Sequence, residues 1–302
     1  MVPRLKDRAA ALAPLGWTGR DAAWLALVCL HSGAFLRAQY LAFLGQPHPE
    51  LAGRFVRRCG KAAVEEAWNG SSLRLCRIAA RPFYRALRAE HVRHRRTASP
   101  PVLLRRLLSL DYVLEHADAP WLATEQEKVA ELTGAGVPSD VLPRRVYRGA
   151  VGAQRRFFAH KLPLALDAER ATFVFVQAED ASASALRTWG EAHAELWARL
   201  AAAGRAVEVV VVGRDVDRLR SAAKVVDGWA ATPPARDPAA ELASLRAAVA
   251  KLDREALDAC GGLNAAIARC AALERVAARR APGRPVPAIA NGRIWRSERV
   301  PN

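Results

Sequence analysis

The stretch PELAGRFVRRCGKAAVEEAWNGSSLRLCRIAARPFYRALRAEHVRHRR, residues 49–96, decides the fold of the first third of the chain. Read as a helix at about 100° per residue, its beginning has an apolar side and a basic side. The apolar side holds Leu51, Phe55, Cys59, Ala62 and Ala63. The basic side holds Arg54, Arg57, Arg58 and Lys61. The apolar side suits a protein core, and the basic side suits phosphate.

A turn and a basic segment follow this helix. Trp68-Asn69-Gly70 is typical of a hairpin turn, and residues 71–78 predict a strand that contains Arg74 and Arg77. Further phosphate contacts are expected from a basic arm that carries Arg88, Arg93, Arg95 and Arg96. The alternative is a solvated basic face with no ligand. His91 and His94 lie in the same arm, but no third ligand is near enough to indicate a metal site.

Two helices are expected before this stretch. The first begins near Thr18, whose hydroxyl and Asp21 predict a capping box, and residues 22–30 are apolar on nearly every side. The second covers residues 36–44, with Gly45 as its stop. Three helices followed by a hairpin is the winged-helix order, in which the third helix enters the major groove of DNA.

The distribution of charge favours a polyanionic partner. The chain has 302 residues, a formal net charge of +16 and a pI near 10.7. Residues 1–116 carry +11, residues 117–240 are neutral, and the remainder carries +5. DNA, RNA and anionic membrane surfaces are the candidates, against an arginine-rich composition whose charge is only solvated. Because the excess is segregated, we expect a nucleic acid.

The apolar runs and the cysteines predict a cytoplasmic protein without a membrane span. The strongest apolar run, residues 22–30, is too short to cross a bilayer, and the N-terminus shows no signal peptide. Five cysteines form no Cys-x-x-Cys pair, so we expect reduced thiols and no metal site. No cofactor motif is present, and none is expected.

The expected fold class is mixed α+β, with four parts. Residues 1–100 form a winged-helix domain, and residues 101–145 form linker helices. A small α/β domain covers residues 146–232, with strands at 157–166, 171–178 and 206–212 and helices at 185–203 and 215–229. Residues 233–302 form a helical hairpin and a mobile basic tail, which Ile294 and Trp295 could anchor. The leucine-rich helix at 102–116 packs within the monomer or forms a dimer seam.

Catalysis is the first alternative to DNA binding. A metal-dependent nuclease would draw on acids of the α/β domain, namely Asp167, Glu179, Asp180 and Glu208. Glu208 is followed by Val209 and Val210, so its strand has no acid-x-Lys, and no catalytic residue is expected. A second alternative is an RNA-binding or interaction scaffold that associates through the C-terminal helices. A homodimer is a candidate assembly.

In architecture, the chain resembles the replication-relaxation family of plasmids and other mobile elements. The residues that carry the resemblance are Thr18-Gly19-Arg20-Asp21, the basic third helix with Arg54, Arg57 and Arg58, the wing from Ser71, and the strand at 157–166. It implies an N-terminal winged helix before an α/β domain, and DNA binding in plasmid maintenance, mobilisation or transcriptional control. The expected function is therefore double-stranded DNA binding by a regulator or accessory factor.

Overall fold

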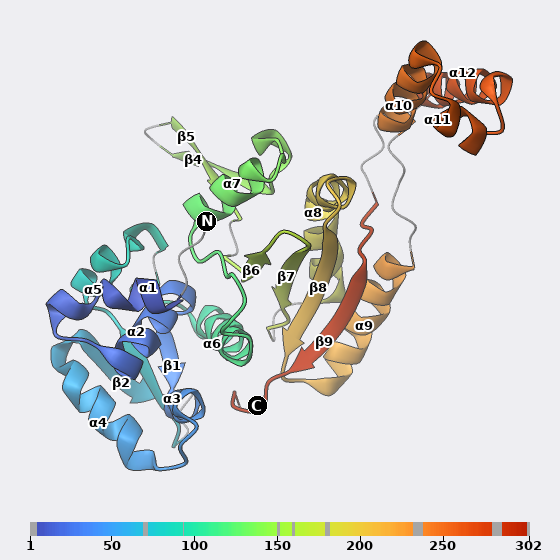
Figure 1. Cartoon of the computed structure of the whole chain (residues 1–302). Coiled ribbons are helices and arrows are strands. Elements are labelled where there is room, and N and C mark those ends of the chain that lie inside the picture. Colours follow the sequence, from blue (N-terminus) through green and yellow to red (C-terminus); the bar gives the residue numbers. More distant parts are fainter. Residues whose placement is uncertain are drawn as a thin grey trace.

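The structure, a computed structural model, is a mixed α+β protein. It describes residues 5–68, 72–92, 94–149, 152–158, 161–178, 182–231, 238–279 and 286–300. Figure 1 shows the N-terminal helices on one side, a four-stranded sheet on the other, and helix α6 between them. Within the described residues, no helix has the length and apolar character needed to cross a bilayer.

The N-terminal part surrounds one core with helices and a small sheet. Its elements are α1 (Leu5–Ala10), α2 (Gly19–His31), β1 (Ala34–Leu36), α3 (Arg37–Leu44), α4 (Pro49–Cys59), β2 (Ala63–Ala67), β3 (Arg74–Ile78) and α5 (Arg81–Ala86). Strand β3 lies between β1 and β2, and both pairs are antiparallel. The predicted helices and hairpin are present. However, Ala62 and Ala63, expected on the helix, lie beyond its end because Gly60 takes a φ of +52°.

Helix α2 is central to this part, as its apolar sequence predicts. Trp24 has no solvent exposure. Its ring lies 5.3 Å from the ring of Phe35 and 5.2 Å from that of Phe43. Aromatic pairs at these distances add specific geometry to the burial of apolar area. Helix α3 is therefore fixed against α2 by ring contacts.

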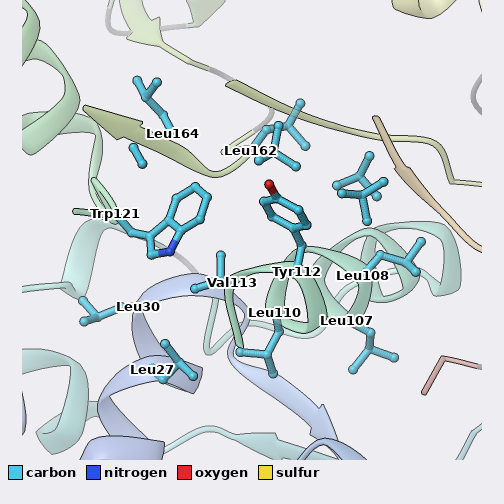
Figure 2. Packing of buried hydrophobic residues seen from close by; sticks show 14 of the residues in the cluster. Leu27, Leu30, Leu107, Leu108, Leu110, Tyr112, Val113, Trp121, Leu162 and Leu164 are labelled. Atoms are coloured by element: carbon cyan, nitrogen blue, oxygen red, sulfur yellow. The ribbon is translucent and has the colours of Figure 1, made fainter. Parts of the chain in front are cut away.

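Helix α6 (Pro100–Glu115) joins the two halves of the molecule. Leu107, Leu108 and Leu110 are fully buried. Figure 2 shows Leu110 on the side of Leu27 from α2, while Tyr112 points the other way, towards Leu162. Each fully buried leucine contributes about 1.5–3 kcal/mol of transfer free energy. The helix packs within the chain, and the two halves share its core.

Helix α7 (Glu125–Gly134) and a separate hairpin follow α6. The hydroxyl of Thr124 caps α7 by accepting a hydrogen bond from the Glu127 N–H at 3.1 Å. The hairpin pairs β4 (Arg144–Gly149) with β5 (Gly152–Phe157). The strand expected at 157–166 is wrong as a single element, because its first residue ends β5 and only residues 164–166 form the next strand.

The second half is an α/β unit in which helices follow two of the strands. Its elements are β6 (Leu164–Leu166), β7 (Arg170–Val176), α8 (Ala183–Ala202), β8 (Ala206–Gly213), α9 (Val216–Ala230) and β9 (Asn291–Arg296). The sheet order is β6-β7-β8-β9; β6 pairs antiparallel with β7, and the other pairs are parallel. Residues 209–212 have no exposure, which confirms the predicted buried strand.

The C-terminal region differs from its prediction. Strand β9 completes the sheet beside β8, so residues 291–296 are not a mobile tail. Three helices, rather than two, lie between α9 and β9: α10 (Pro238–Lys251), α11 (Arg254–Ala259) and α12 (Leu263–Arg279). The first helix of the expected hairpin divides into α10 and α11 because Asp253 caps α11, accepting a hydrogen bond from the Ala256 N–H at 3.3 Å. Figure 1 shows these three helices apart from the sheet.

A buried carboxylate, Asp111 of α6, connects the last residues to the N-terminal part. One of its oxygens accepts hydrogen bonds from the Gln39 amide of α3 and from Arg299, both at 3.2 Å. The other oxygen accepts from the Ser297 hydroxyl at 2.6 Å. Val300 is only 1% exposed. The segment after β9 is therefore fixed, because its polar groups satisfy a carboxylate that water cannot reach.

Candidate nucleic-acid interface

Helix α4 presents its basic side to solvent because its apolar side is held in the core. Pro49 occupies the first turn, where its missing N–H costs nothing, and the helix ends before Gly60. Phe55 is 2% exposed, and its ring lies 4.5 Å from the ring of Tyr40 and 5.9 Å from that of Phe35. These contacts fix the rotation of the helix about its axis.

Three exposed cations on this side make no ion pair with any described residue. Arg54 and Arg57 lie on α4, and Lys61 follows in a 3₁₀ turn, Gly60–Ala62. An unpaired surface cation exchanges water and counterions for phosphate without losing a contact to the protein. These three side chains are the part of the predicted interface that the structure leaves open to a ligand.

Arg58 has a different environment from the other cations of α4. It donates to Asp21 at 2.6 Å, and its guanidinium lies 4.3 Å from the ring centroid of Trp17. Asp21 also accepts from the Tyr40 hydroxyl at 2.8 Å. The predicted capping box is therefore wrong: α2 does begin after Thr18, but Asp21 binds α3 and α4 instead of the helix end. Arg58 holds α4 against the beginning of α2.

The β2–β3 hairpin places two predicted DNA-binding residues differently. Arg74, opposite Ala67 at the beginning of β3, is exposed. Arg77 lies opposite Val64 and is half-buried. The β2–β3 hairpin therefore offers Arg74 to a ligand more openly than Arg77.

The segment expected to be a basic arm is packed against the protein. Val92 and His94 are buried. Arg106 donates to the His94 carbonyl oxygen at 3.0 Å, and Lys161 donates to that of Val92. Burial, assisted by Arg106, Lys161 and other cations, holds the pKa of His94 well below its usual value. The prediction of a basic arm is wrong. Arg106 and Lys161, which are distant in the sequence, donate hydrogen bonds to backbone carbonyl groups of this segment and hold it against the protein.

The cations of this segment do not share one surface. Arg88 is exposed and lines a cleft beside α7. Arg95 is half-buried, and Arg96 is exposed, with its carbonyl oxygen 3.5 Å from Arg106. Arg93 lies outside the described residues. The nine predicted DNA-binding residues that the structure describes therefore divide between the α4 side, the β2–β3 hairpin and this packed segment.

Sequence reasoning missed the basic β4–β5 hairpin. It carries five arginines and no acidic residue, Arg144, Arg145, Arg148, Arg155 and Arg156. The net charge of residues 117–240 is zero, so a sum over that range does not reveal the local excess of arginines in the hairpin. Arg145 lies directly opposite Arg156, an arrangement of like charges that is unfavourable without a counterion. A count over a window as short as one hairpin would have found it.

The acids considered for a nuclease have structural roles where they are described. Asp167 accepts hydrogen bonds from the N–H groups of Glu169 and Arg170 at 2.9 and 2.6 Å, in the turn between β6 and β7. Glu208 of β8 pairs with Arg293 of β9 at 2.9 Å. The other two acids, Glu179 and Asp180, lie outside the described residues. In the described part of the chain, no three His, Cys, Asp or Glu side chains gather as metal ligands would.

Comparison with known proteins identifies no relative. No family model, curated protein or solved structure matches the chain. The function therefore has to be inferred from the chemistry of the described residues.

Proposed function

We propose that the protein binds double-stranded DNA, with α4 in the major groove and the β2–β3 hairpin along the backbone. The observation that carries the proposal is the unpaired, exposed set Arg54, Arg57 and Lys61 on a helix whose other side is fixed in the core. Because the helix is rigid, its cations are already held in one geometry. Binding therefore costs little conformational entropy.

The surrounding elements support the same proposal. Strand β1 precedes α3, and it pairs with the β2–β3 hairpin that follows α4. This arrangement suits a winged helix, in which one helix reads base edges and the wing contacts phosphate. A regulator or accessory factor of a plasmid or other mobile element is the role that we propose for it.

The test is binding to duplex DNA across a salt series. The triple variant Arg54→Ala, Arg57→Ala, Lys61→Ala leaves Arg58 in place, because its loss would also break the ion pair with Asp21. We expect weaker binding and a slope of log K against log salt that is shallower by about 3, since each phosphate contact contributes about 0.9.

A control variant separates local contacts from net charge. Arg187→Ala, Arg220→Ala, Lys224→Ala removes the same charge from exposed positions on α8 and α9. We expect it to keep nearly the wild-type slope. Equal slopes for the two triple variants would refute the proposal, because net charge alone would then explain binding.

A further inference from the structure

A cleft of about 860 Å³ lies away from α4, between the N-terminal part and the β4–β5 hairpin. Its walls come from Arg88 to Val92, from α7 with the residues before it, and from the hairpin base with Phe158 and Lys161. Figure 1 shows α7 beside β4–β5 and far from α4. The volume lies within the range of about 300–1,000 Å³ that is usual for small-ligand sites.

The cleft has an excess of positive charge. Four cations line it, Arg88, Lys128, Arg156 and Lys161, against one carboxylate, Glu125. Glu125 is already engaged, since one oxygen accepts from the Phe157 N–H at 2.9 Å and the other lies 3.7 Å from Arg156. Glu125 therefore does not fully compensate the charges of Arg88 and Lys128.

Lys128 is the cation that most clearly lacks a counterion. It is 3% exposed, and its ammonium donates to the Leu162 carbonyl oxygen at 2.5 Å. Its nitrogen lies 5.7 Å from the ring centroid of Phe158. None of the described carboxylates is within ion-pair distance of it. Burying an ammonium without a paired anion is costly, so an anionic ligand would relieve that cost.

Aromatic rings lie beside these cations. Tyr147 of β4 is 49% exposed and lines the cleft, as do Phe157 and Phe158. Tyr147 is exposed, whereas Phe157 and Phe158 are half-buried. Accessible rings next to cations suit a ligand that combines a planar base with phosphate, because bases stack on aromatic side chains while ammonium and guanidinium groups bind phosphate oxygens.

Backbone strain gathers at the same place. Among the described non-glycine residues, four have a positive φ, and three of them line this cleft: Arg88 at +54°, Phe158 at +46° and Lys161 at +54°. Such conformations cost free energy and cluster at functional sites, where surrounding structure fixes them. The surrounding structure here includes the bond from Lys161 to the Val92 carbonyl oxygen.

We infer that this cleft binds a nucleotide, with its phosphate against Lys128, Arg88 and Arg156 and its base against Tyr147 and Phe158. The nucleotide is either free or an unpaired unit of a nucleic-acid strand, which share this chemistry. The inference does not depend on DNA binding by α4, because the two surfaces lie apart.

The test is isothermal titration calorimetry of the full chain with four probes at low salt. The probes are adenosine 5′-monophosphate, adenosine, inorganic phosphate and a five-nucleotide oligodeoxyadenylate. Binding of the monophosphate, with adenosine and phosphate each weaker by about tenfold or more, identifies a free nucleotide. Binding of the oligodeoxyadenylate alone identifies a strand. Failure of both, or adenosine binding as tightly as its monophosphate, overturns the inference.

Variants locate the binding. Arg88→Gln with Arg156→Gln changes two side chains at the surface of the cleft, and Lys128→Met removes the buried cation at similar volume. We expect each to weaken the bound probe by about tenfold or more. The α8–α9 variant Arg187→Ala, Arg220→Ala, Lys224→Ala is the control and should bind the probe like the wild type. Wild-type affinity in both cleft variants would also overturn the inference, and circular dichroism checks their fold.

Discussion

Removing the charge of Lys128 should stabilise the protein at neutral pH. Burial lowers the pKa of Lys128 from 10.5 to about 8; the charge of Glu127 partly offsets this shift, and the charge of Lys161 adds to it. One pKa unit corresponds to about 1.4 kcal/mol, so the charged form costs the folded state about 3 kcal/mol. In Lys128→Met the Leu162 carbonyl oxygen loses its donor, at a cost of about 1–2 kcal/mol. The expected net gain at pH 7 is about 1–2 kcal/mol.

The pH dependence gives a sharper form of this prediction. Between pH 8 and 10.5 the unfolded chain binds a proton at Lys128 that the folded chain has lost, so the wild-type free energy of unfolding gains about 3 kcal/mol relative to the variant. Urea unfolding of both proteins from pH 7 to 10.5 measures the difference, and groups common to both cancel. A pH-independent difference, or a variant less stable at pH 7, would refute the reasoning that Lys128 is buried without a counterion.

Three further predictions concern the packing of the chain. Asp111→Ala should lower the free energy of unfolding by about 3 kcal/mol in urea titrations, because Gln39 and Arg299 lose their shared acceptor; a loss below about 1 kcal/mol would contradict this role. Gly33→Ala should lower the free energy of unfolding by at least about 2 kcal/mol more than Gly45→Ala does. Both glycines have a positive φ, but only at position 33 would an added Cβ lie 2.5 Å from a backbone oxygen, that of His94. Equal thermal stability of those two variants would mean that residues 92–96 do move as an arm. Replacing residues 232–285 with a short glycine-serine linker should leave a protein that is folded by circular dichroism. The reason is that the Ile289 N–H donates to the Trp229 carbonyl oxygen, which holds the two ends of the replaced segment together. An unfolded product would show that α10–α12 support the sheet.

Local sequence signals predicted most of the helices and the central strands. Residues 209–212 are four consecutive valines, which only a strand buried on both faces accommodates comfortably. Helix α4 followed from an apolar and a basic side at helical spacing, and Thr124 and Asp215 marked the beginnings of α7 and α9.

The errors arose where distant residues decide the structure. The segment expected to be a basic arm is packed against the protein, because Arg106 and Lys161 donate hydrogen bonds to its carbonyl groups. A local sequence pattern does not predict such distant donors. Strand β9 was missed because its partner, β8, lies about 80 residues earlier, and four described helices, α9 to α12, separate the two strands in the sequence. The cleft combines residues from 88–92 and 123–130 with Tyr147, residues 156–158 and Lys161, and no single motif contains all of them.

The central claim is that α4 lies against DNA, and site-specific photo-crosslinking tests it most directly. A benzophenone-bearing amino acid is placed at Glu50, exposed in the first turn of α4, and in a second protein at Arg187, exposed on α8. With a labelled duplex, we predict cross-linking from position 50 that competing unlabelled duplex removes, and little from position 187. Equal yields at the two positions, or a yield only at position 187, would contradict the account.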